Sequence, residues 1–160
     1  MSPARKSALL VFLGIAVAAC GGSPEPLPPA IPYQDPGAVE AGAHRLRYAL
    51  TLTTDLPAES AGSYGIEQRR KLALLVLTLE RRDAGPGNRV DADFMAAETV
   101  SLTGQRHALA LARHEDPGGP TWLAPVEVRH RVPLAIEIRA RAASASPEIR
   151  ARLTREFRLQ

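Results

Sequence analysis

Apolar and polar residues alternate along positions 44–53 of this chain. His44, Leu46, Tyr48, Leu50 and Leu52 occupy every second position, and arginine, alanine and threonine stand between them. Successive side chains of a β-strand point to opposite faces of a sheet, so a period of two predicts a strand with one buried face.

A continuous apolar run follows at residues 72–77, with the sequence Leu-Ala-Leu-Leu-Val-Leu. The run is too short to cross a bilayer, which takes about 20 apolar residues. It is typical of a central strand that is covered on both faces. Leucine and alanine also favour helices, so a helix is the alternative, but the strand-like segments around the run favour a strand.

Further strand-like segments lie at residues 90–103, 107–113, 126–141 and 149–159, separated by loops rich in glycine and proline. Pro125 and Pro133 bracket residues 126–132; because proline cannot donate to a ladder, they indicate an edge strand or a change of sheet. The last segment has the clearest alternation, which predicts a strand paired in a sheet up to the C terminus. About seven strands predict an all-β domain over residues 44–160, a single antiparallel β-sandwich of immunoglobulin-like or transthyretin-like type. A closed barrel is the alternative.

Residues 20–43 have a different composition. Six prolines fall there among glycine, alanine and serine, without apolar periodicity. Such a composition predicts an extended, flexible tether in front of the folded domain.

The first 20 residues carry an export pattern. Arg5 and Lys6 precede a short apolar stretch at 9–17, and the small residues Ala18 and Ala19 precede Cys20, the only cysteine. A positive start, a short apolar stretch and small residues before a cut define a signal peptide. An ordinary secretory signal is the alternative to the more specific interpretation that follows.

Residues 17–20, Val-Ala-Ala-Cys, resemble the lipobox of bacterial lipoproteins at every position. The resemblance implies that Cys20 is lipidated and that the signal peptide, residues 1–19, is removed between Ala19 and Cys20. It also implies a membrane partner, through N-terminal acyl chains. Gly21 and Gly22 follow instead of the aspartate that retains many such proteins in the inner membrane, so in a two-membrane cell the resemblance implies the outer membrane, facing the periplasm.

Charge and cysteine content narrow the functional classes. One cysteine excludes a disulfide within the chain. Of 20 Lys and Arg residues, two precede the cut, which leaves 18 against 17 Asp and Glu and a net charge of +1 for the mature chain. A near-neutral, exported chain with few aromatic residues lacks the footprint of nucleic-acid binding, so we expect no nucleic-acid partner.

Catalytic and metal-binding patterns are weak. The sequence has no nucleophile elbow, no His-x-x-x-His pair and no glycine-rich phosphate loop, which predicts a protein that is not an enzyme and carries no cofactor. Asp83, Asn88, Asp91 and Asp93 offer oxygen ligands for calcium, but their spacing fits no EF-hand loop, and solvated loop acids are the alternative.

Arginine and glutamate stripes on the later strands are the remaining candidates for function. If the strands are neighbours, the arginines form one surface for an acidic partner; cross-strand ion pairs on a solvated face are the alternative. Trp122 is either an exposed anchor or buried at a sandwich edge. The candidate surface comprises Arg129, Arg131, Arg139, Arg141, Arg150, Arg152 and Trp122.

The sequence therefore predicts a lipid-anchored envelope protein that serves as a structural or interaction module, or as an accessory subunit of an envelope assembly, with a protein partner in the envelope. A periplasmic lipoprotein that binds a small molecule, glycan or metal is the alternative.

Overall fold

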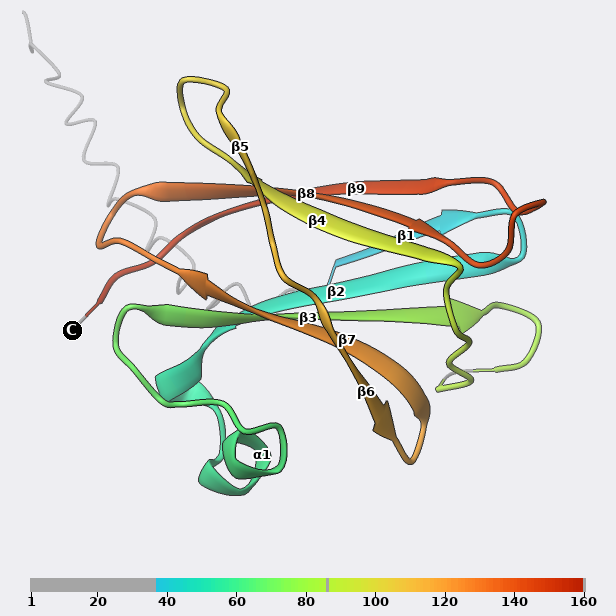
Figure 1. Ribbon diagram of the computed structural model, residues 1–160, viewed down its shortest axis with the longest axis horizontal. Coiled ribbons are helices and arrows are strands. Elements are labelled where there is room, and N and C mark those ends of the chain that lie inside the picture. Colours follow the sequence, from blue (N-terminus) through green and yellow to red (C-terminus); the bar gives the residue numbers. More distant parts are fainter. Residues whose placement is uncertain (1–36, 86, 160) are drawn as a thin grey trace, which may run out of the picture. The chain divides into compact units, whose positions relative to one another are not determined.

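Two antiparallel sheets form the protein, whose computed structural model describes residues 37–85 and 87–159 (Figure 1). The five-stranded sheet has the order β1 (Gly37–Ala41), β2 (His44–Leu52), β3 (Leu72–Arg81), β7 (Gly119–Glu127), β6 (Ala112–Asp116). The four-stranded sheet has the order β5 (Arg106–Ala108), β4 (Phe94–Val100), β8 (Pro133–Arg141), β9 (Ile149–Glu156). A 3-10 helix, η1 (Thr53–Asp55), and a short helix, α1 (Ala58–Ser63), join β2 to β3. The all-β sandwich is confirmed, with nine strands in the described residues rather than about seven, and the closed barrel is wrong.

The chain passes between the sheets three times in the described residues. β3 leads into β4, residues 109–111 join β5 to β6, and residues 128–132 join β7 to β8. At the second passage the Leu109 N–H still donates to Ala97 O at 2.8 Å, before the chain turns to the other sheet. The sequence segment 107–113 is therefore not one strand but two short strands in different sheets.

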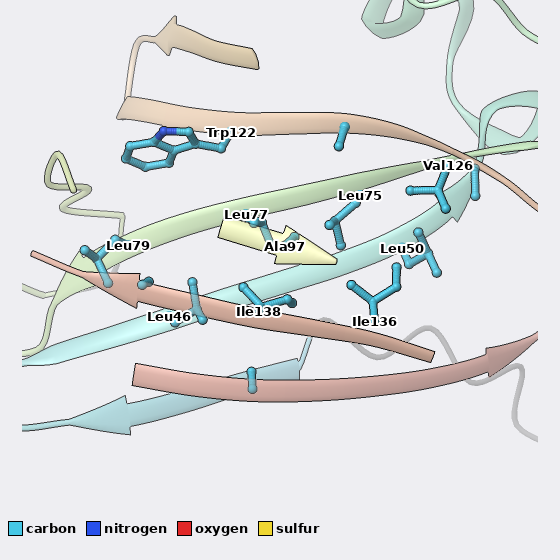
Figure 2. Close-up of a cluster of buried hydrophobic side chains, with 14 of the residues drawn as sticks. Leu46, Leu50, Leu75, Leu77, Leu79, Ala97, Trp122, Val126, Ile136 and Ile138 are labelled. Carbon is cyan, nitrogen blue, oxygen red and sulfur yellow. The ribbon is translucent and has the colours of Figure 1, made fainter. Parts of the chain in front are cut away.

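The core lies between the two sheets (Figure 2). β3 supplies Leu75, Leu77 and Leu79 to it, while its other face buries Leu74. A strand with β2 on one side, β7 on the other and both faces covered needs apolar residues at consecutive positions. The central strand predicted from the apolar run at 72–77 is confirmed as part of β3, and the helical alternative is wrong.

The folded domain begins before His44. β1 pairs with β2 from Gly37↔Tyr48 to Ala41↔His44, so residues 37–43 belong to the five-stranded sheet and not to a tether. Gly37 fits beside the Tyr48 ring, where a Cβ atom would come within 2.1 Å of a ring carbon. The lipobox, Cys20 and the rest of the predicted tether lie outside the described residues. No helix in the described part is long and apolar enough to cross a membrane.

β7 differs from the predicted strand at 126–132, since it covers residues 119–127. Val128 N–H donates to Lys71 O beside β3, so the nitrogen of Pro125, three positions earlier, faces away from β3. β6 has already ended on that side, at Ala112↔Leu123, so the missing N–H of proline breaks no ladder bond. Residues 128–132 are the passage to the four-stranded sheet, which agrees with the expected change of sheet. Val132, at the end of this passage, is exposed.

The last strand is paired as the sequence predicts. β9 pairs with β8 along its whole length, from Ala140↔Ile149 to Pro133↔Glu156. Arg155, which interrupts its apolar face, donates from its guanidinium to Leu50 O and lies over the Phe157 ring, 5.0 Å from the centroid.

Candidate functional site

Five arginines gather on the outer face of the four-stranded sheet, the face turned away from the core. β8 and β9 supply four of them in adjacent registers, and Arg106 reaches the same face from β5. We call this surface the arginine face; it comprises Arg106, Arg139, Arg141, Arg150 and Arg152, together with Glu98, Glu137 and Glu148.

One half of the arginine face is neutralised within the sheet. Glu98 of β4 lies opposite Glu137 of β8, a like-charge pair that is destabilising by itself. Arg106 donates to both carboxylates, at 2.6 Å to Glu137, and Arg152 approaches Glu137 at 3.9 Å. The hydrogen bond from Arg106 holds the pKa of Glu137 below its usual range. This half fits the predicted alternative of cross-strand ion pairs on a solvated face.

The other half keeps an excess of positive charge. Arg139 of β8 lies directly opposite Arg150 of β9. Arg150 pairs with Glu148 at 2.6 Å, whereas Arg139 forms no ion pair with any described residue and lies 5.6 Å from the Phe94 ring centroid. Arg141 approaches the same ring at 6.0 Å, and its Nε is buried with no hydrogen-bond partner in the described structure.

A shallow groove of about 440 Å³ opens on the arginine face. It is lined by residues of both halves, the carboxylates Glu98 and Glu137 and the arginines Arg106, Arg139, Arg150 and Arg152. A carboxylate in the groove would therefore lie beside guanidinium groups, whose planar N–H fork matches a carboxylate in two hydrogen bonds.

The structure brings together only part of the predicted surface. Arg139, Arg141, Arg150 and Arg152 lie on one face, but Arg129 and Arg131 lie in the passage between β7 and β8, away from it. They are apart because residues 128–132 leave the sheet. Trp122 is 6% exposed and packs in the core from β7, so it is not an exposed anchor (Figure 2).

The sequence did not point to Arg106, a member of the arginine face, or to Phe94, which lies against Arg139. Arg106 lies in a three-residue strand that no clear alternation marks, and Phe94 begins β4. The signal for Arg106 is the pair of carboxylates that it neutralises, Glu98 and Glu137, and this pair becomes visible only once β4 and β8 are known to be neighbours.

A second polar cluster lies at the β6–β7 hairpin of the five-stranded sheet. Asp116 accepts hydrogen bonds from Tyr64 Oη at 3.0 Å, from Thr121 Oγ1 at 2.8 Å and from Arg89 at 2.9 Å. Arg89 also donates to Thr121 Oγ1 at 2.6 Å, and His114 meets the Tyr64 ring edge-on at 5.5 Å.

The hydrogen bonds within this cluster shift the pKa values of Asp116 and Tyr64 in opposite directions. Burial raises the pKa of Asp116, but the hydrogen bonds from Thr121, Tyr64 and Arg89 outweigh it and hold that pKa below its usual range. Burial and the bond to Asp116 raise the pKa of Tyr64. Both carboxylate oxygens of Asp116 accept hydrogen bonds from neighbouring side chains. The cluster therefore connects the segment after α1, the loop before β4 and the β6–β7 hairpin.

Two of the three aspartates that could offer oxygen ligands to calcium, Asp83 and Asp91, pair with arginines instead. Asp83 accepts from Arg81 at 2.5 Å, and Asp91 accepts from Arg113 at 2.8 Å. The hydrogen bonds from these arginines lower the pKa of both carboxyls. Within the described residues, no group of three or more His, Cys, Asp or Glu side chains could hold a metal ion.

The similarity of this chain to known proteins lies in the fold. No family model and no curated protein sequence matches the chain. A structure of FetP from uropathogenic Escherichia coli strain F11 has a TM-score of 0.49 at 8% identity, over 78% of this chain and 94% of its own. A copper-bound variant of the same protein has a TM-score of 0.47 at 12% identity, over 77% of this chain and 93% of its own. A DUF4426 family protein from Pseudomonas aeruginosa PAO1 has a TM-score of 0.64 at 18% identity, over 80% of this chain and 98% of its own. The chain thus has the fold of the DUF4426 protein, a small antiparallel β domain.

Proposed function

We propose that this chain is a lipid-anchored envelope protein whose arginine face binds an acidic segment of a partner protein. The observation that carries the proposal is the pair Arg139 and Arg150, two arginines held directly opposite each other on adjacent strands. Like charges in that register cost stability. A carboxylate of a partner would relieve the repulsion and gain charge-assisted hydrogen bonds.

Several features make this half of the face suited to a protein partner. The paired strands hold the backbone of the arginines in place. Binding therefore has to order only the arginine side chains, and not the backbone that carries them. Arg139 and Arg141 flank the Phe94 ring, which adds an apolar contact between the cations. Electrostatic complementarity of this kind favours fast, specific association more than high affinity.

The anchoring half of the proposal rests on the lipobox resemblance. Acyl chains on Cys20 would hold the protein at the membrane, since two chains suffice for stable anchoring. Residues 20–36 would then separate the membrane from β1. Metabolic labelling with an alkyne fatty acid tests this: the natural chain should be labelled and sediment with membranes, and Cys20→Ser should lose the label. A natural chain without label would contradict the anchoring.

Binding of a fluorescent poly-glutamate peptide, followed by anisotropy, tests the arginine face in isolation. We expect salt-sensitive binding that the double variant Arg139→Gln/Arg150→Gln weakens by about tenfold, equivalent to about 1.4 kcal/mol. The matched control is Arg45→Gln/Arg82→Gln, which removes the same charge from two arginines that pair with Glu40 on the other sheet.

The stability of the two variants separates binding from folding. Because Arg139→Gln/Arg150→Gln removes a repulsion, its melting temperature should not fall. Equal loss of peptide binding in the two double variants would mean that net charge, and not the arginine face, attracts the peptide.

A further inference from the structure

A second groove, of about 710 Å³, opens at the end of the sandwich that carries the C-terminal residues. Residues 69–72, at the start of β3, form one side, and residues 127–130, where the chain leaves β7, form the other. Leu159 completes it. Figure 1 shows these segments together at the end marked C, away from the β1–β2 turn.

The groove has an apolar floor and a cationic rim. Leu72 and Val128 are buried beneath it, and Leu159 is half-buried. Four cationic side chains line it, Arg69, Arg70, Lys71 and Arg129, against one carboxylate, Glu127. Such a combination fits an anion that is attached to an apolar group.

Most of these cations have no acidic partner in the described part of the chain. Arg69 pairs with Glu67 at 3.3 Å, whereas Arg70, Lys71 and Arg129 form no ion pair with a described residue. The opposite end of the sandwich differs, since its cations are paired: Arg81 with Asp83, Arg82 with Glu40 and Arg113 with Asp91. Unpaired cations therefore gather around the groove.

The backbone around the groove is fixed by contacts between residues 130–131 and the C-terminal residues 157–159. Leu159 N–H donates to His130 Nδ1 at 3.0 Å, and Arg131 N–H donates to Phe157 O at 2.8 Å. Because Nδ1 of His130 accepts, the proton of the neutral ring stands on Nε2, which is a donor. His130 thus adds a hydrogen-bond donor to a preformed rim.

Exposed apolar side chains occur at the same end. Leu102 is 87% exposed and Val132 is 42% exposed, and these are the large hydrophobic residues that the described structure leaves in solvent. Val132 lies two positions after His130, and Leu102 lies in the β4–β5 turn, which projects at this end in Figure 1. Exposed apolar side chains at the same end of the sandwich as unpaired cations are the features of a surface that contacts lipid.

We propose that this groove binds the phosphate headgroup of an anionic membrane lipid, while Leu102 and Val132 enter the interfacial layer of the bilayer. Arginine recognises phosphate through bidentate hydrogen bonds, and the apolar floor accommodates the glycerol and the first carbons of the acyl chains. The site is separate from the arginine face and does not depend on lipidation of Cys20.

Sedimentation with vesicles tests the proposal, using the chain from residue 20 with Cys20→Ser so that no acyl chain contributes. We expect binding to vesicles that contain phosphatidylglycerol and none to pure phosphatidylcholine. Arg70→Gln/Arg129→Gln should weaken it about 30-fold, which corresponds to about 1 kcal/mol for each cation near an anionic surface. The control Arg45→Gln/Arg82→Gln should bind like the unsubstituted chain.

Soluble probes distinguish the sources of phosphate. Dihexanoyl-phosphatidylglycerol, below the concentration at which it forms micelles, should shift the NMR signals of Val128 and Leu159. Leu102→Ser/Val132→Ser should weaken binding to vesicles and leave binding of the short-chain lipid unchanged. Melting temperatures of all variants check that they fold.

Three outcomes would overturn the proposal. The first is equal loss of vesicle binding in the two arginine variants. The second is binding of glycerol phosphate as tight as that of the short-chain lipid without vesicle binding, which would identify a soluble phosphate ester as the ligand. The third is binding of poly-glutamate in this groove with no response to phosphatidylglycerol, which would identify an acidic peptide.

Discussion

Asp116→Ala removes the acceptor that Tyr64, Arg89 and Thr121 share. Removing one partner of a buried charge pair costs about 3–5 kcal/mol. Asp116 is 17% exposed and Arg89 is 28% exposed, so solvent screens part of the interaction and about half of that cost remains. Thr121, which is buried, also loses a partner. We expect a loss of about 2–3 kcal/mol in the free energy of unfolding, or about 10 °C in Tm.

The pH dependence of this loss follows from the pKa of Asp116, which lies below its usual range in the folded protein. A carboxyl with a lowered folded-state pKa contributes its full stability above the unfolded value of about 3.9. The contribution is lost as the pH falls through the folded-state pKa. Asp116→Ala should therefore differ most from the natural chain at neutral pH, and the difference should shrink in acid.

Urea unfolding at several pH values measures both effects, and Asp93→Ala is the matched control. Asp93 is exposed and its carboxylate makes no hydrogen bond or ion pair with a described residue, so its loss should change stability by less than about 0.5 kcal/mol. A loss as small as this for Asp116→Ala, or a large loss that does not change with pH, would refute the role assigned to the cluster.

Three further predictions concern stability. Ile138→Ala, in the centre of the core, should cost about 2–5 kcal/mol in urea unfolding, and a smaller loss would mean that the core is loosely packed. Truncation before Pro147 removes β9 and should abolish cooperative thermal unfolding, and a truncated chain that still melted cooperatively would contradict this. Both Gly119 and Gly85 have positive φ, so replacing either with alanine strains the backbone, but only at Gly119 would the added Cβ also meet Arg89, at 2.9 Å. Gly119→Ala should therefore lower the free energy of unfolding by about 1–3 kcal/mol more than Gly85→Ala does. Equal melting temperatures for the two glycine variants would contradict this close approach.

Strand identity was predictable where a single periodicity governs a segment. The alternation at 44–52 and 149–156 and the apolar run of β3 each predict one strand, and burial in the structure follows them. β1 was missed because its glycine and alanine content continues the composition of the proline-rich segment. Only pairing with β2, and the fit of Gly37 beside Tyr48, makes it a strand.

Tertiary context decides the remaining differences. Pro125 indicated the start of a strand, yet it lies within β7, because its nitrogen faces the side on which β7 no longer has β6 as a neighbour. The arginine face was predictable in part, since Arg139, Arg150 and Arg152 follow the alternation of β8 and β9. Arg129 and Arg131 have the same spacing in sequence but lie in the passage between sheets, which local periodicity does not reveal.

Site-specific photocrosslinking in the native envelope tests the central proposal most directly. Ala96 lies opposite Arg139 on the arginine face, and Ala49 lies on the outer face of the other sheet. A photoreactive residue at Ala96 should give one discrete crosslinked protein that Arg139→Gln/Arg150→Gln abolishes and Arg45→Gln/Arg82→Gln retains, and Ala49 should not give it. The same product from both positions, or its persistence in Arg139→Gln/Arg150→Gln, would contradict an acidic partner on the arginine face.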